Sequence, residues 1–585
     1  METTTKRART RRLVPLALFL TSLCGVLALG SCRDNDFDLS DVDMTVGLGG
    51  GDTLTLPGNN STRAIQMDEV LKLNNSSFVR IADNGDYELS MTDGNVHRES
   101  VSVGSFVISG SSVEPYSIPA VVGSADKPIV TLNFEATDID KSILALNSLT
   151  SDCQARISIQ VPSTLHQISR LTLSFPSFLH VSSFTLDGVK KTVGSDNSVV
   201  LDGLRSGMHA ILVNIDQIEC NRTAADGSSI AFDAAAHKLT MKVNALLRMT
   251  VAPSDLASTS TVGTIEGGGK TEPASVKTIT GRFNKEIGYD NLGSVSLQGI
   301  PDFLDDNDVV FDLYNPTVFI HFNNDLPVNA LLGGVLTSTD ANGRTLASVE
   351  VPQFSVASGE QVVAIQAKAK AYGADTVAVT VADLPSLIRK IPNRVTFGQI
   401  KASADGTKTS LVTLGKDYQV EAQYAFSSPL QFGENTSIIY SDSITDMHDG
   451  VKDLMFIEKN GKPDGGLIAE ADVENCLPLY LTVEAWGVDV DGKAIPKEKL
   501  PVTVTPSVKA SADGKPVTTH IRMTVIPTDN DVFRTLDGIH YRLVGTTTAQ
   551  GQSPVTGVTL NAYKQTLKIS GLTVSKYGKV IGNFN

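Results

Sequence analysis

Cysteine is scarce in this chain of 585 residues: there are five, and Cys24 and Cys32 lie near the N-terminus. The other three, Cys153, Cys220 and Cys476, are far apart in sequence, whereas a disulfide framework or a zinc site needs close pairs. We expect these three to be buried free thiols, with a bond between Cys153 and Cys220 as the open alternative. Apolar cores, and not covalent cross-links, must then hold the domains together.

Tryptophan is scarcer still, since Trp486 is the only one and aromatic residues make up 6% of the chain. Proteins that bind sugars often stack the sugar ring on an exposed aromatic side chain. Trp486 lies on the polar face of its expected strand, which makes it the candidate platform for a ligand. The alternative is that a neighbouring domain covers it.

The chain has no surplus of positive charge. Its formal net charge is −15, and the first 31 residues carry five positive side chains and one negative, which leaves −19 on the remainder. Nucleic-acid binding requires clustered Lys and Arg to neutralise phosphates. We therefore expect no nucleic-acid partner.

Catalytic motifs are missing as well. The chain has no Gly-x-Ser-x-Gly elbow, and none of its nine histidines is followed by glutamate. Gly269-Lys270-Thr271 would end a phosphate-binding loop, but Thr264 stands where that loop needs glycine. His448 lies in a polar run that predicts a surface loop. The sequence thus predicts a protein that is not an enzyme, and a hydrolase with dispersed catalytic residues is the alternative.

No metal-binding pattern is complete. Calcium needs only clustered oxygen ligands, and the densest acidic run contains Asp305, Asp306 and Asp308. Asp83–Asp86 and Asp489–Asp491 are similar, but none of the three runs has the twelve-residue loop with its final glutamate. We expect solvated turns and no cofactor, with structural calcium as the alternative.

What the chain does have is alternation of apolar and polar residues with a period of two. It is clearest in Leu239–Val251, Tyr418–Phe426, Leu477–Ala485 and Ile521–Val525, and it predicts strands with one buried face. Asn-Gly and Asp-Gly pairs between such segments predict hairpin turns. Helical periodicity is confined to 67–73 and 385–390. The predicted fold class is all-β, as tandem antiparallel β-sandwich domains.

These signals divide the chain into several parts. The expected ranges are a leader at 1–31, an acidic and glycine-rich tether at 32–75, sandwich domains at 76–257, 276–430 and 431–585, and a linker or long loop at 258–275. The linker prediction rests on the run STSTVGTIEGGGKTEPAS, which is rich in Ser, Thr and Gly.

An internal repeat supports more than one domain of the same kind. Asn324-Asp325-Leu326-Pro327 recurs as Asn475-Cys476-Leu477-Pro478, and each copy precedes a strand and an Asp-x-[Asn/Asp]-Gly turn. The earlier part of the chain has no clear copy of this motif. With Asn315-Pro316 upstream, the first copy resembles late-embryogenesis and water-stress domains over about 30 residues, although Asp325-Leu326 replaces their second Asn-Pro. This resemblance implies a small β-sandwich without an enzymatic site.

The N-terminus has the order of a secretory signal. Lys6, Arg7, Arg9, Arg11 and Arg12 precede the uncharged run 13–30. An uncleaved transmembrane anchor is the alternative, since 18 uncharged residues approach the length of a membrane span. Pro15 and Gly25 within the run, and the absence of a basic flank after it, favour a cleaved signal.

The run ends in Leu29-Gly30-Ser31-Cys32, which resembles the lipobox of bacterial lipoproteins. The resemblance implies cleavage before Cys32 and attachment of acyl chains, such as palmitate, to that residue. Two or more acyl chains anchor a protein stably in a lipid bilayer.

The acidic run 34–38 that follows is similar to the export signals of surface lipoproteins in the Bacteroidales, whose uncharacterised multi-domain β-rich members the whole chain resembles. This implies the cell-surface side of the outer membrane, with its periplasmic face as the alternative. We expect a non-enzymatic binding or assembly component with protein partners at the cell surface. A glycan- or lipid-binding module of an uptake system is the first alternative.

Overall fold

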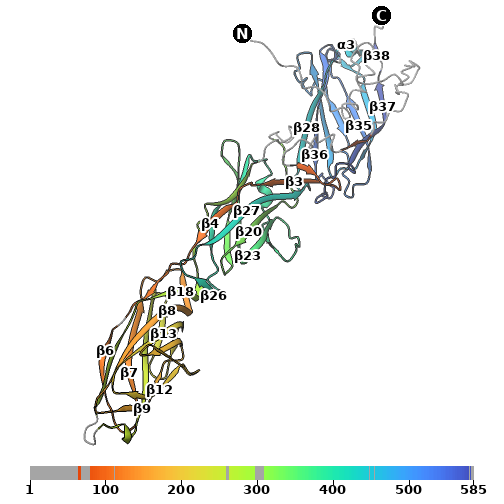
Figure 1. The fold of residues 1–585 in the computed structure, drawn as a ribbon. Helices are drawn as coiled ribbons and strands as arrows, with labels where there is room; N and C mark the ends of the chain where they lie inside the picture. Colours follow the sequence, from red (N-terminus) through yellow and green to blue (C-terminus); the bar gives the residue numbers. More distant parts are fainter. Residues whose placement is uncertain are drawn as a thin grey trace.

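The computed structural model describes residues 64–66, 79–110, 112–257, 263–296, 308–446, 448–452, 455–578 and 580–581. The leader, Cys32 and most of the tether lie outside these ranges. Nearly all regular elements are β-strands in antiparallel sheets, which confirms the predicted all-β fold class. Three bodies follow one another along an elongated molecule (Figure 1). Within the described ranges, no helix has the length and apolar character to cross a membrane.

The tip domain, at the lower end of Figure 1, is one continuous stretch of chain from β5 to β18. One sheet has the order β11-β10-β13-β8-β17-β6, and β18 pairs with β8 beyond the end of β17. The other has the order β12-β9-β16-β15-β14, with β7 on the free edge of β16. The strands are β5 Val107–Ile108, β6 Ser112–Pro119, β7 Gly123–Ala136, β8 Ile143–Val161, β9 Gln167–Ser174, β10 Leu179–Leu186, β11 Val189–Lys191, β12 Ser198–Arg205, β13 Gly207–Glu219, β14 Arg222–Thr223, β15 Ser229–Asp233, β16 Lys238–Val251, β17 Thr264–Thr271 and β18 Ala274–Phe283.

The middle domain combines chain from before and after the tip domain. Its sheets have the orders β2-β3-β27-β20-β23-β24, with β4 also paired to β27, and β19-β25-β21-β22. The elements are β2 Val79–Ile81, β3 Tyr87–Thr92, β4 His97–Val101, β19 Asn291–Ser296, β20 Thr317–Asn324, β21 Ala330–Thr339, β22 Thr345–Val356, β23 Gly359–Gln366, β24 Thr376–Thr380, the 3-10 helix η4 Leu384–Leu387, β25 Arg394–Ala404, β26 Ser410–Thr413 and β27 Tyr418–Pro429.

The terminal domain holds the first and the last described strands. Its main sheets have the orders β1-β37-β32-β35-β34 and β28-β36-β33. The elements are β1 Ile65–Gln66, β28 Ser437–Ile444, α3 His448–Val451, β29 Met455–Phe456, β30 Glu458–Lys459, β31 Lys462–Pro463, β32 Gly466–Asn475, β33 Tyr480–Asp489, β34 Val502–Thr505, β35 Val517–Val525, the 3-10 helix η5 Asn530–Arg534, β36 Leu536–Thr546, β37 Thr566–Tyr577 and β38 Val580–Ile581.

The three domains are nested along the chain. The chain contributes β1 to the terminal domain, then β2–β4 to the middle domain, and then forms the whole tip domain. It returns to complete the middle domain and finally the terminal domain. Both described ends of the chain therefore lie at the end of the molecule opposite the tip domain (Figure 1).

All three domains share one strand order. The order β6-β17-β8-β13 in the tip domain corresponds to β3-β27-β20-β23 in the middle domain and β1-β37-β32-β35 in the terminal domain. In the second sheets, β7-β16-β9 corresponds to β19-β25-β21 and β28-β36-β33. The fold thus contains three copies of a sandwich, one more than the sequence repeat indicates.

The sequence repeat marks one buried asparagine in each of two copies. The Asn324 side chain donates to the carbonyls of Val328 and Ala357 and accepts from the amide of Leu326. Asn475 makes the corresponding bonds to Leu479, Lys509 and Leu477. Both asparagines have zero exposure, so each fixes the end of its strand to the next strand and to a loop across the sandwich.

Asp140 joins the descending and returning chain between the tip and middle domains. Its carboxylate accepts from the Gly104 amide at 2.8 Å, from the Lys285 ammonium at 2.9 Å and from Ser142. Burial alone would raise the pKa of Asp140, but these donors hold it well below its usual range. Residues 278–281 of β18 also pair with β26, which extends a tip sheet into the middle domain.

The predicted linker at 258–275 is wrong for its described part. Residues 264–271 form β17, which pairs with both β6 and β8, and residues 274 and 275 begin β18. The glycines reflect packing: the Tyr116 side chain crosses β17 and donates to the Ser158 carbonyl at 3.1 Å. A Cβ on Gly267 would lie 2.2 Å from the Tyr116 hydroxyl and 2.3 Å from that carbonyl. Burial under this arrangement raises the pKa of Tyr116.

The predicted boundaries at 76 and 276 are also wrong. β3 and β4 pair with β27, and β2 pairs with β3, so all three belong to the middle sheet and not to the tip domain that follows them in sequence. β18 belongs to the tip domain through its pairing with β8. Alternation shows that a segment is a strand, but it does not show which strand is its partner. Of the two expected helical segments, 67–73 lies outside the described residues and 385–390 overlaps η4.

The nesting predicts which fragments fold alone. A fragment of residues 104–283 should unfold cooperatively, because it contains a complete sandwich. Residues 284–429 should not fold, since they lack the buried side chains of Tyr87, Leu89 and Val101, which contribute about 5–8 kcal/mol of burial. Circular dichroism during thermal unfolding tests both fragments. Fusing residues 79–103 to the second fragment is the control and should restore its transition; a transition without them would contradict the nesting.

The role of Gly267 can be tested by Gly267→Ala. The new Cβ overlaps a backbone carbonyl that cannot move away, so the free energy of unfolding should fall by about 1–3 kcal/mol. The matched control is Gly398→Ala in β25, where a Cβ meets no atom within 4 Å and the effect should stay within about 0.5 kcal/mol. Denaturant unfolding measures both, and equal effects would refute this packing role.

Candidate functional site

Trp486, the candidate platform, lies on the outer face of the sheet β28-β36-β33 and is partly buried. Its ring packs against His540 on the neighbouring strand, with 4.5 Å between ring centroids. The Lys497 ammonium lies 5.9 Å from the Trp486 ring centroid. The ring therefore makes its closest aromatic contact within its own domain.

The pair most similar to a catalytic dyad is adjacent to Trp486. The Ser443 hydroxyl and the Nδ1 atom of His540 are 2.6 Å apart, and both residues belong to the cross-strand row that includes Trp486. This row lies on a sheet surface and contributes nothing to the hollow described below. The row is ordered and polar, but its geometry does not identify a position where a substrate would bind.

The calcium candidates lie in or next to a segment outside the described residues. Asp305 and Asp306 fall within it, and Asp308 is paired with Arg542 at 3.0 Å. Asp489 accepts amide hydrogens of its own hairpin, and Asp86 accepts from the Asn561 side chain. Across the described part of the chain, no group of three His, Cys, Asp or Glu side chains is arranged to hold a metal ion. His448 begins the short helix α3, so the prediction that it lies in a surface loop is wrong.

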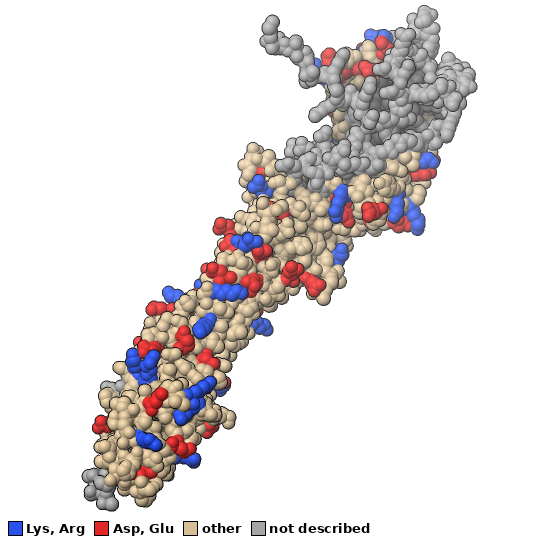
Figure 2. All heavy atoms as spheres, in the orientation of Figure 1, with Lys and Arg blue, Asp and Glu red and all other residues tan. Residues whose placement is uncertain are grey.

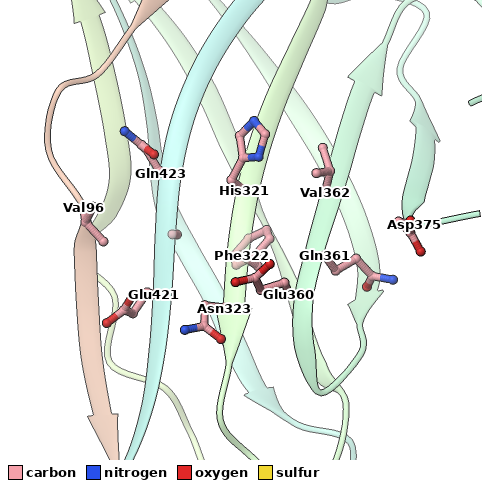
Figure 3. Close-up of a pocket in the computed structure, with 11 residues that line it drawn as sticks. Val96, His321, Phe322, Asn323, Glu360, Gln361, Val362, Asp375, Glu421 and Gln423 are labelled. Atoms are coloured by element: carbon pink, nitrogen blue, oxygen red, sulfur yellow. The ribbon is translucent and has the colours of Figure 1, made fainter. Parts of the chain in front are cut away.

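A shallow hollow of about 410 Å³ opens on the outer face of the middle domain. β27, β20 and β23 form its floor, and Figure 3 shows its lining side chains. Gln423, His321 and Val362 make one cross-strand row. Glu421, Asn323 and Glu360 make the next row in the same way.

Two connections form the walls of the hollow. Val96, in the connection between β3 and β4, is 51% exposed on one side, and Asp375, just before β24, lies on the other. Phe322 is the only aromatic residue in the lining, and it is 3% exposed because it points into the core. The open surface therefore consists of amides, an imidazole, carboxylates and two valines.

The charge of the hollow is negative. It has three carboxylates, from Glu360, Asp375 and Glu421, and Arg98 next to it is bonded to Glu421 at 2.6 Å. In the described structure, neither Glu360 nor Asp375 has a cation within ion-pair distance. Sequence reasoning placed Glu421 and Gln423 on a polar strand face, but it did not identify a concave site.

Outside the hollow, charges of both signs are interspersed. On the face drawn in Figure 2, Lys and Arg alternate with Asp and Glu along the described parts of the tip and middle domains. This distribution is typical of a solvated surface.

The comparisons with known proteins reveal no family. No protein-family model and no curated protein matches the chain. Among solved structures, a presumed secreted protein from Parabacteroides distasonis aligns with 16% identity over 52% of this chain and 90% of its own, with a TM-score of 0.35. An exo-beta-agarase aligns with 8% identity over 27% of this chain and 20% of its own, with a TM-score of 0.14. At such scores neither likeness bears on the activity of this chain.

The three described cysteines are buried and free, as predicted, and no bond joins Cys153 to Cys220. Burial raises the pKa of Cys153 to about 11 and that of Cys220 to about 12. Both thiols are thus neutral at physiological pH and are unsuited to nucleophilic chemistry.

This predicts slow thiol labelling in the folded protein. At pH 8 roughly one Cys153 side chain in a thousand, or fewer, should be the reactive thiolate, because the pKa lies far above the pH. A Cys32→Ala variant without its leader should react with Ellman's reagent only when unfolded, and then at three sites. Rapid reaction of the folded variant would show that these thiols are accessible.

Proposed function

We propose that the protein is a lipid-anchored lipoprotein on the outer surface of the outer membrane, where it acts as a non-enzymatic binding or assembly component. The nested fold is the observation that carries the proposal. An anchor at Cys32 precedes β1, and β1 lies in the domain opposite the tip. Attachment at that end leaves the tip domain as the part of the protein farthest from the membrane.

The tether supports this arrangement. Cys32 precedes Ile65 by 33 residues, which span up to about 110 Å when fully extended. The terminal domain is therefore not required to contact the bilayer, and the surface of the whole rod is available to partners.

The binding role is supported by the shape of the surface. Folds with exposed sheet faces and strand edges bind partners through those faces or by adding a strand. The described structure also presents a concavity, the hollow of the middle domain. Its open lining of carboxylates, amides and an imidazole offers polar groups to a bound ligand.

Surface display can be tested with epitope insertions at two exposed hairpins. One follows Gly188 in the tip domain and the other follows Gly514 in the terminal domain; both glycines have positive φ in tight turns. In cells that carry the native protein, both tags should bind antibody on intact cells, and Cys32→Ala should abolish this labelling. Exposure of the tags only after the outer membrane is broken would place the protein on the periplasmic face instead.

A pull-down of the lipidated protein from its own membranes tests the binding role. We expect stable protein partners to co-purify with it, and Cys32→Ala should lose those that require the membrane. If no protein co-purifies while a polysaccharide or lipid panel binds, the glycan- or lipid-binding module replaces the proposed role.

A further inference from the structure

The shared strand order allows the same sheet face to be compared in all three domains. In the terminal domain, carboxylates of β32 are paired with side chains of β35: Asp472 with His520 at 2.9 Å, and Glu470 with Arg522 at 3.5 Å. In the tip domain, Glu272, which follows β17, is paired with Lys270 at 2.8 Å and with Arg156 of β8 at 3.7 Å. Both domains therefore contain cross-strand charge pairs on this face.

The middle domain has one such pair, Arg98 with Glu421 at 2.6 Å, but it departs from the pattern in the strands that form the rest of the hollow. The strands that correspond to β32 and β35 are β20 and β23, and on this face they carry His321, Asn323, Glu360 and Val362. Glu360 is exposed and directly opposite Asn323, so it has no cation across the strand. The structure gives Asp375 on the facing wall no cation either, within the residues that it describes.

Three uncharged polar side chains of the hollow are also available for hydrogen bonding. Among the described residues, the side chains of His321, Asn323 and Gln423 have no hydrogen-bond partner (Figure 3). Asn323 lies in the row of Glu421 and Glu360, and His321 and Gln423 lie in the row next to it. Acceptor oxygens of both amide and carboxylate type are therefore presented together in one open concavity.

We propose that this hollow binds an arginine or lysine side chain of a protein partner, with Glu360 and Asp375 as its counter-charges. A guanidinium group has five donors and no acceptor, which matches a site rich in carboxylate and amide oxygens. An anionic ligand would be repelled. A neutral sugar would find no aromatic platform, because Phe322 is the only lining aromatic residue and it faces the core.

The dimensions agree with a side chain as the ligand. About 410 Å³ is enough for one or two long side chains, and Val96 and Val362 can pack against their methylene groups. The proposal gives a chemistry to the partner of the binding role above and rests on that role. Its test uses purified protein, so its failure is distinguishable from a failure of membrane anchoring.

The test is calorimetric titration of the full-length, detergent-solubilised protein at low salt. The probes are three capped peptides, Gly-Arg-Gly-Arg-Gly and its glutamine and glutamate counterparts. We expect binding of the arginine peptide alone, and Glu360→Gln with Asp375→Asn should weaken it about three- to tenfold, as for partly exposed ion pairs. Both side chains are exposed, so the melting temperature of this variant should equal that of the parent.

The matched control is Glu350→Gln with Asp383→Asn, which removes the same charge from exposed positions away from the hollow. It should change the affinity less than twofold. Equal weakening by both double variants would mean attraction by net charge alone and would overturn the proposal. Equal binding of the glutamine peptide would overturn it too. So would an uncharged oligosaccharide that binds in place of the arginine peptide and whose binding depends on Glu360 and Asp375.

Discussion

The whole structure depends on backbone pairing between the early strands of the chain and the last strand of each domain. β1 pairs with β37, β3 and β4 pair with β27, and β5 and β6 pair with β18 and β17. Without these partners each sandwich would present an open edge next to its buried core. The same pairing joins the domains, because the N-terminal part of the described chain, from β1 to β6, supplies an edge strand to each of them. It is reinforced by side chains, such as Arg98 with Glu421, that are 323 residues apart in sequence.

The repeated sandwich is fixed by different side chains in its three copies. Asn324 and Asn475 make the same hydrogen bonds in their domains. In the tip domain, Asp255 fixes the corresponding end of the sandwich. That carboxylate accepts from the amides of Ser169 and Ala252 and from the Gln167 side chain. A buried polar group with every bond satisfied specifies where a strand must end, whichever residue supplies it. The three domains therefore share a strand order although different residues fix it.

Particular residues show how much the sequence could predict. Alternation predicted the strands now seen as β16, β27 and β35, and the Asn-x-Leu-Pro repeat located two equivalent positions. The third copy escaped because Val161-Pro162-Ser163-Thr164-Leu165 has no asparagine at that place. Gly267 was assigned to a linker because composition does not reveal that Tyr116 crosses it. The hollow was missed because the polar face of Tyr418–Phe426 is visible in the sequence, while the walls around it come from residues 96 and 375.

The nesting also fixes the order in which the domains can be completed as the chain is made. β1 has no partner until residues 566–567 have been made; β3 has only β2, and β4 has none, until residues 418–429 have followed. The tip domain, in contrast, is complete once residue 283 has been made. The chain must therefore complete its domains from the tip domain back toward the terminal domain. Its earliest strands pass most of synthesis as unpaired edges, and the short length of β1 and the charges of β3 and β4 reduce the risk that they pair with another chain.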